Sequence, residues 1–216
     1  MPAAIWNTVI TLVNSSPQPV AVRVNFYGDD GSPWTLPLSV TQHGSTQPSA
    51  ATPVLDGVLS PHTSLQIATA ALPATVTGWA EVLSPGPVGG YAIFRTTPPS
   101  GPASEGTAPL QAQSPSTVVL SYDNTTGYVM GVAFANASPA PTEITATIWD
   151  ETGSLLGTQA IALPGRGHSA LVLPAQIPLT AGKRGIVRFV GSGTGGIAAL
   201  GLRFSPFGTF TSVPAQ

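Results

Sequence analysis

An internal repeat constrains the fold of this chain more than any other feature. Residues 14–17 read Asn-Ser-Ser-Pro and residues 136–139 read Asn-Ala-Ser-Pro, and each stretch lies between an apolar run and an alternating run. At the offset that superposes Asn14 on Asn136, Tyr27 also aligns with Trp149. Later segments align in the same order, which predicts two repeats of about one hundred residues each.

Both repeats have the residue pattern of antiparallel β-structure. Residues 20–27 place an apolar residue at every second position, which is the period of a strand with one buried face. The sequences Asp-Asp-Gly at 29–31 and Glu-Thr-Gly at 151–153 supply the glycine that a tight turn between two strands favours. The pattern of each repeat therefore predicts a series of short strands. Residues 174–181 could form at most one helical turn.

The strand spacing predicts an all-β protein made of two tandem antiparallel immunoglobulin-like β-sandwich domains. We place the first domain at residues 1–112 and the second at 113–216, with the boundary in a segment rich in Pro, Ser and Gly. The first domain carries an insert at 41–57, which is either a mobile surface loop or a contact for a ligand or partner.

The second repeat begins with an extra strand, residues 116–124, that has no counterpart in the first. The first repeat is therefore expected to lack a strand at one sheet edge, where unpaired backbone groups can recruit another strand. Two alternatives follow. The edge is short or is covered by the 41–57 insert, or another subunit supplies the strand by β-strand addition.

Composition limits the classes of partner. Charged residues make up 7% of the chain and the formal net charge is −2, so a nucleic-acid partner, which needs clustered Lys and Arg, is not expected. There is no apolar run long enough for a membrane span, and the first residues lack the features of a signal peptide. The absence of cysteine excludes disulfides and thiol catalysis. Low charge and abundant Ser, Thr and Pro favour an extracellular or cell-surface location.

No catalytic motif is present, and we expect no enzymatic activity, no cofactor and no metal site. His62 and His168 fall at nearly matching places in the two repeats, which indicates a structural role. Arg95 and Arg203 also align, and we expect each to anchor an ion pair, with Glu105 or Asp123 as the partner. Three Asn-x-Ser/Thr sequons start at Asn14, Asn124 and Asn136, and as sequons they predict surface positions.

Five residues are candidates for contact with a ligand or partner. Exposed tryptophans can serve as platforms for sugar rings, although each can equally fill the core or cover a sheet face. Trp149 aligns with Tyr27 beside a turn, and a histidine lies in the insert. The candidates are Trp6, Trp34, Trp79, Trp149 and His43.

Several segments together resemble a family of repeated β-sandwich segments found in predicted secreted proteins of bacteria. The segments are the Asn-Ser-Ser-Pro turn, Asp-Asp-Gly, Gly-Trp-Ala-Glu-Val (78–82), Ala-Ile-Phe-Arg (92–95), Tyr-Asp-Asn-Thr (122–125) and Leu-Gly-Leu-Arg-Phe-Ser-Pro (200–206). The resemblance covers nearly the whole chain. It implies export and an immunoglobulin-like sandwich, and it implies no activity and no catalytic residue.

Two function classes remain. The first is a non-enzymatic extracellular structural or adhesive protein, a fibre-type subunit that assembles with copies of itself by β-strand addition. Low charge favours such association, because little repulsion keeps copies apart. The alternative is a carbohydrate-binding module whose partner is a polysaccharide. A hydrolase has no supporting group of residues.

Overall fold

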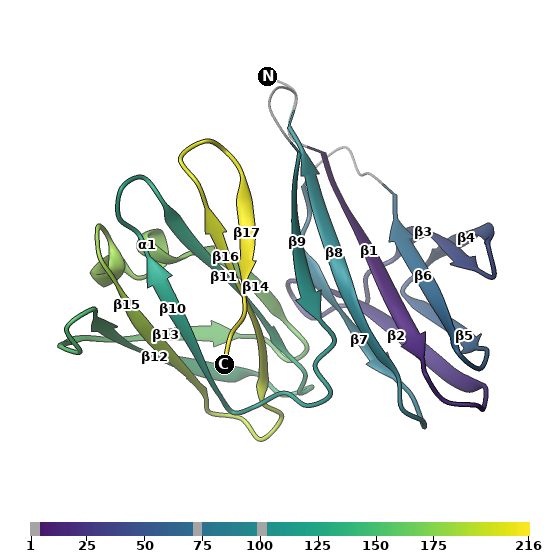
Figure 1. The fold of residues 1–216 in the computed structure, drawn as a ribbon. Helices are drawn as coiled ribbons and strands as arrows, with labels where there is room; N and C mark the ends of the chain where they lie inside the picture. Colours follow the sequence, from purple (N-terminus) through teal and green to yellow (C-terminus); the bar gives the residue numbers. More distant parts are fainter. Residues whose placement is uncertain (1–4, 71–74, 99–102) are drawn as a thin grey trace. The chain divides into compact units, whose positions relative to one another are not determined.

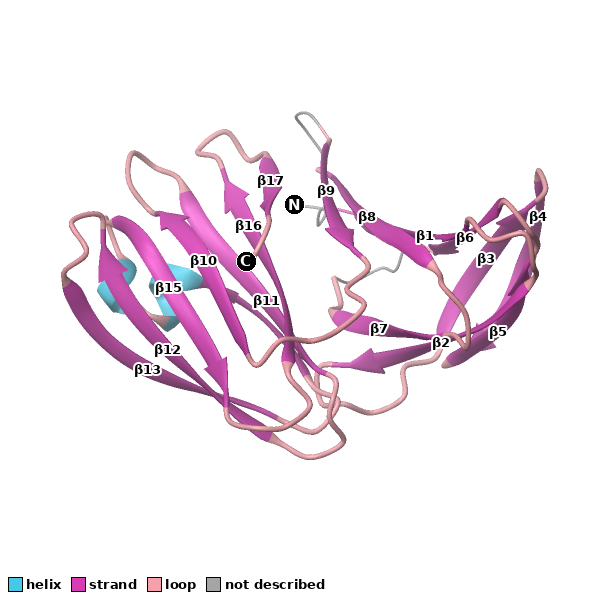
Figure 2. Ribbon diagram, turned by 60° about the horizontal axis from the view of Figure 1, so that its bottom comes forward, coloured by secondary structure: helices cyan, strands magenta, loops and turns pink. Residues whose placement is uncertain are grey.

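The computed structural model describes residues 5–70, 75–98 and 103–216, and almost all of them lie in antiparallel strands or the turns between strands (Figures 1 and 2). The all-β prediction is thus confirmed. The chain divides into two compact units. Unit 1 comprises Met1–Gly28 and Pro33–Leu110, and unit 2 comprises Asp29–Ser32 and Gln111–Gln216.

Unit 1 contains two antiparallel sheets. One has six strands in the order β4-β3-β6-β1-β8-β9, and the other has three strands in the order β5-β2-β7. The strands of unit 1 are β1 (Ile5–Asn14), β2 (Val20–Gly28), β3 (Leu36–Gln42), β4 (Ser45–Thr52), β5 (Val54–Leu59), β6 (Thr63–Thr69), β7 (Gly78–Leu83), β8 (Gly89–Thr97) and β9 (Ser104–Pro109).

Unit 2 contains two sheets of four strands, in the orders β10-β15-β12-β13 and β14-β11-β16-β17. Its elements are β10 (Thr117–Asp123), β11 (Val129–Asn136), β12 (Thr142–Asp150), β13 (Leu155–Leu163), β14 (His168–Val172), the short helix α1 (Leu173–Gln176), a 3-10 turn (Pro178–Thr180), β15 (Arg184–Gly191), β16 (Ile197–Phe204) and β17 (Phe210–Val213). The sequence allowed at most one helical turn within 174–181, and the structure has two short helical segments in this region, α1 and the 3-10 turn.

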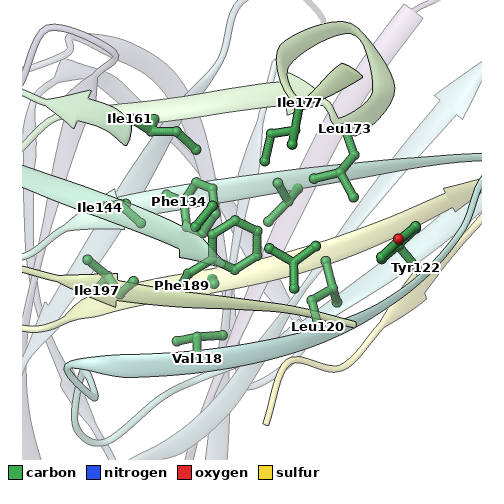
Figure 3. Close-up of a cluster of buried hydrophobic side chains, with 14 of the residues drawn as sticks. Val118, Leu120, Tyr122, Phe134, Ile144, Ile161, Leu173, Ile177, Phe189 and Ile197 are labelled. Atoms are coloured by element: carbon green, nitrogen blue, oxygen red, sulfur yellow. The ribbon is translucent and has the colours of Figure 1, made fainter. Parts of the chain in front are cut away.

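The buried side chains of unit 2 come from both of its sheets and form one core between them (Figure 3). Phe134 of β11 and Phe189 of β15 meet edge to face at its centre, with ring centroids 4.7 Å apart. Leu173 and Ile177 close the core from α1 and the following turn, and both are fully buried. Burial of apolar surface on this scale is the main stabilising contribution in a domain of this size.

Seven strands of unit 1 have counterparts in unit 2 with the same pairing. Thus β1, β2, β5, β6, β7, β8 and β9 correspond to β11, β12, β13, β14, β15, β16 and β17. The units differ in two additions. Unit 1 has the hairpin β3–β4, which extends its larger sheet beyond β6, and unit 2 has β10, which lies beside β15.

The repeated Asn turn is a buried backbone anchor in both units. The Asn14 amide donates to the carbonyls of Gln18 at 2.7 Å and Leu59 at 3.2 Å, and its oxygen accepts from the Ser16 N–H at 2.9 Å. Asn136 repeats this arrangement, with donation to Ala140 and Pro164 and acceptance from Ser138. Each amide satisfies carbonyls of a loop that would otherwise be buried without partners.

The sequon asparagines are not at the surface, so that prediction is wrong. Asn14 and Asn136 are 1% exposed and Asn124 is 8% exposed. Asn124 donates to the Thr180 carbonyl at 3.1 Å and accepts from the Met130 N–H at 2.7 Å. A buried amide that is bonded on both sides is a structural group, and a glycan could not be attached to it in the folded protein.

The interpretation of 41–57 as a long loop is also wrong. Residues 36–52 form a β-hairpin whose two-residue turn is His43-Gly44, both with positive φ (52° and 74°), as the favoured hairpin turn requires. The rest of the segment enters β5, which pairs with β2. Pro48 is tolerated because β4 is an edge strand of its sheet.

Strand register corrects two of the alignments between repeats. Asn7 lies opposite Arg95, and its counterpart Val129 lies opposite Phe204, so Arg95 corresponds to Phe204 and not to Arg203. A shift of one residue moves a side chain to the other face of a sheet. Similarly, the turn before β6 places His62 at φ 54°, and the matching turn before β14 places Arg166 at φ 54°, two residues before His168.

Candidate functional site

The side of unit 1 that ends at β7 differs most from its counterpart in unit 2. In unit 2, β15 lies between β12 and β10. In unit 1, β7 pairs with β2 from Arg23–Leu83 to Gly28–Gly78, and the described part of this sheet ends there. The two strands nevertheless occupy equivalent positions, because Glu81 and Arg188 lie opposite the matching residues Asn25 and Thr147.

The additional strand completes the core of unit 2. Val118, Leu120 and Tyr122 of β10 point inward and are at most 3% exposed. Gly201 on β16 makes room for Leu120, since a Cβ at that position would overlap the leucine side chain. Unit 1 has no described strand that supplies three such side chains at the equivalent place.

The inward side chains of β7 are accordingly smaller and less covered than those of β15. Ala80 and Val82 lie opposite Phe26 and Val24 and are half-buried. Their counterparts Val187 and Phe189 are completely buried. Among the described residues, the buried core cluster of unit 1 has ten members and that of unit 2 has seventeen.

The outward face of β7 carries the predicted contact residue Trp79 in close packing with other side chains of unit 1. Trp79 stacks on Tyr27 with ring centroids 5.1 Å apart and planes inclined by 27°. Glu81 accepts hydrogen bonds from the Asn25 amide at 3.0 Å and from the Tyr27 hydroxyl at 3.4 Å. This face is therefore a packed polar and aromatic cluster within unit 1.

The other predicted contact residues lie at separate places. Trp34 packs against the core of unit 1, where its ring occupies the space beside Gly78. Trp6 is half-buried in β1. Trp149 is half-buried in unit 2 with the Arg188 guanidinium 5.3 Å above its ring. His43 is exposed at the hairpin turn, with Nε2 3.1 Å from Ser60 Oγ.

Unit 2 has a shallow depression of about 680 Å³ that gathers charged side chains. It is lined by Asp123, Asp150, Glu151, Arg184 and Arg203, together with the half-buried Trp149. The expected ion pairs of the two arginines are confirmed. In unit 2, Arg203 Nη2 lies 3.0 Å from Asp123 Oδ2, and in unit 1, Arg95 Nε lies 3.7 Å from Glu105 Oε1.

Two carboxylates of the depression, Asp123 and Asp150, have lowered pKa values. The pKa of Asp123 lies below its ordinary value, chiefly because the Thr125 hydroxyl donates a 2.6 Å hydrogen bond to it, and Arg203 adds to the effect. The pKa of Asp150 is lowered in the same way by Thr152. A general acid needs the opposite shift, so these two groups act as turn-stabilising acceptors.

A second depression, of about 310 Å³, lies on the outward face of the larger sheet of unit 1. Its lining includes Asn7, Gln66, Tyr91, Ile93, Arg95 and Glu105, which come from β1, β6, β8 and β9. Sequence reasoning did not identify this set. The available signal was the alternation Tyr91, Ile93, Arg95, which places the three side chains on one face of β8.

No family model matches the chain, and no curated protein matches it in sequence. Within the part of the chain that the structure describes, no helix is long and apolar enough to cross a membrane. The same residues contain no group of three or more His, Asp and Glu side chains placed to hold a metal ion.

Proposed function

We propose that this chain is a non-enzymatic structural or adhesive subunit that acts outside the cell and assembles with copies of itself. In this proposal both units are immunoglobulin-like sandwiches in tandem. Unit 2 contains all of its strands, and unit 1 takes the strand beside β7 from another copy. The low charge of the chain supports close association of copies.

The observation that carries the proposal is the difference between β7 and β15. In unit 2, β15 is followed by the paired strand β10, whose inward side chains are buried, whereas in unit 1 the described sheet ends at β7. A strand added beside β7 would extend the three-stranded sheet and would cover Ala80 and Val82. Both contributions favour association without any change in the rest of the unit.

The competing explanation was that this edge is short or is covered by the 41–57 insert. The strand pairing places that segment elsewhere. The hairpin β3–β4 hydrogen-bonds to β6 in the larger sheet, and β5 pairs with the other side of β2. The insert therefore does not pair with β7 in the position that corresponds to β10 in unit 2.

The alternative function, a carbohydrate-binding module built on the tryptophans, receives less support. Trp79 is stacked on Tyr27, Trp149 has Arg188 over its ring, and Trp34 packs against the core. A sugar platform needs an open ring face, and each of these contacts already uses part of the ring surface that a sugar would need.

The proposal is tested by measuring the mass and shape of the purified protein over a wide range of concentration. Light scattering and electron microscopy on the same samples should show large oligomers or filaments whose fraction rises with concentration. A constant monomer mass at every concentration would contradict the proposal.

Two adjacent lysine variants locate the contact. Val82→Lys places a charge on the inward side of β7, where it can reach solvent past the sheet edge in the monomer but would be buried by an added strand. Leu83→Lys adds the same charge to the exposed outward face and serves as the matched control. We expect Val82→Lys to prevent assembly and Leu83→Lys to assemble, with circular dichroism confirming that both remain folded.

A further inference from the structure

The depression on the outward face of unit 1, which we term the Tyr91 groove, has the features of a ligand site. It is about 310 Å³ in volume, and its lining residues come from β6, β1, β8 and β9. These four strands are neighbours in the six-stranded sheet (Figure 2). Tyr91 is 39% exposed, although it sits in the interior of a six-stranded sheet. We propose that this groove binds a segment of a neutral polysaccharide.

The side chains around Tyr91 match the chemistry of a sugar chain. Val9 and Ile93 are half-buried in the floor, and directly across the strands Tyr91 lies between the small side chain of Thr11 and Pro109. The C–H face of a sugar ring packs on such an exposed aromatic surface. The exposed amides of Asn7 and Gln66 can donate to and accept from hydroxyl groups at the rim.

The charge of the groove favours a neutral ligand over an ionic one. Its two charged side chains are Arg95 and Glu105, which lie opposite each other on β8 and β9 with Nε and Oε1 3.7 Å apart. The pair has no net charge, and each partner is about half exposed. An anionic polymer would need an excess of cationic side chains that this face does not provide.

The second unit shows that the fold does not require these residues. The same positions in unit 2, identified by strand register, carry only apolar side chains. Asn7, Gln66, Tyr91, Arg95 and Glu105 correspond to Val129, Ala170, Leu200, Phe204 and Phe210.

The ion pair of the groove is thus replaced by an aromatic pair in unit 2. The Phe204 and Phe210 rings lie with centroids 5.7 Å apart, in the place of Arg95 and Glu105. The same strand pairing forms with either set of side chains. The polar side chains of unit 1 are therefore not needed for the fold, and they are available to bind a ligand. This inference is independent of the proposed assembly, because the groove lies on the six-stranded sheet and β7 belongs to the three-stranded one.

Affinity electrophoresis tests the proposal with defined polymers. Native gels containing hydroxyethylcellulose, xylan, galactomannan or dextran should show retardation of the full chain by at least one polymer. The retardation should be insensitive to salt, because no net charge is paired on binding. Tyr91→Leu, which places the unit 2 side chain at this position, should weaken binding about tenfold. Gln66→Ala, also the unit 2 residue, should weaken it in the same direction.

Tyr128→Leu in unit 2 is the matched control, since it makes the same chemical change outside the groove, and it should bind as the wild type does. The proposal is overturned if none of the four polymers retards the protein, or if Tyr91→Leu and Gln66→Ala both bind as the wild type does. Retardation by an anionic polymer such as alginate alone, abolished by salt, would also overturn it. Val82→Lys, which tests assembly, should still be retarded, because β7 belongs to the other sheet of unit 1.

Discussion

The β7 side of unit 1 and the β15 side of unit 2 share one strand register and differ in how completely they are enclosed. Val187 and Phe189 are fully buried under β10, whereas Ala80 and Val82 are half-buried. The outer edge of β10 is itself contacted by the chain, since Val119 and Gln216 exchange two backbone hydrogen bonds of 2.6 and 2.9 Å. The comparison shows what a complete sheet of this kind contains and therefore what unit 1 would gain from an added strand.

A matched pair of core truncations should expose this difference most strongly. Phe189→Ala should destabilise unit 2 by about 3–5 kcal/mol, because it leaves a cavity in a closed core. Val82→Ala at the equivalent position should cost unit 1 only about 1 kcal/mol, because it removes two methyl groups that are half-exposed. Urea-dependent hydrogen exchange reports the two units separately. Similar large losses in both would mean that β7 is as enclosed as β15.

The Asn turns provide the opposite test, because here the units should respond alike. Asn14→Ala and Asn136→Ala should each destabilise the unit that contains the change by about 2 kcal/mol, since each leaves buried carbonyls without donors. Asn14→Asp should cost more, because an ionised carboxylate would face the carbonyls of Gln18 and Leu59. Urea unfolding measures the losses. A neutral effect in either repeat would show that the turn is not a shared anchor.

Acid should lower the stability of unit 2 through protonation of Asp123. This effect should be smaller than those of the core truncations and of the Asn substitutions. Its folded-state pKa is lowered, so its stabilisation is fully present above the unfolded-state pKa of about 3.9 and is lost as the pH falls through the folded-state value. The contribution should be less than about 1 kcal/mol. Asp123→Asn should flatten the decline of the unit 2 urea midpoint below about pH 4. If the urea midpoint of Asp123→Asn declines with pH as steeply as that of the wild type, Asp123 does not contribute to the acid sensitivity of unit 2.

The sequence predicted best those features that depend on local or repeated signals. The Asn turn could be recognised because the same side chain, at the same place in both repeats, donates hydrogen bonds to buried loop carbonyls. The all-β class followed from the period-2 alternation in segments such as 20–27. The absence of a counterpart to 116–124 was also visible, since it is a difference in strand number between two copies of one pattern.

Features that depend on pairing could not be predicted in the same way. Strand β4 lacks apolar alternation, and its hairpin turn uses histidine at positive φ, which is uncommon. The alignment of Arg95 with Arg203 followed residue identity, and only strand register shows that these residues lie on opposite faces. The tryptophans were chosen by type, whereas their packing partners come from strands distant in sequence.

The Tyr91 groove illustrates the same limit. Its side chains belong to β1, β6, β8 and β9, which are not consecutive along the chain. Only the pairing of these strands brings Gln66 beside Thr11 and Thr11 beside Tyr91. A sequence without strand order therefore cannot show that these residues share one surface.

The most direct test of the assembly account is hydrogen exchange of the β7 amides as the protein concentration is raised. We expect residues 78–83 to become protected as the mass increases, because an added strand would form hydrogen bonds along β7. Residues 184–191 of β15, which already lie between two strands, should show no change. Assembly without added protection at 78–83, or protection that rises equally in both segments, would contradict the account.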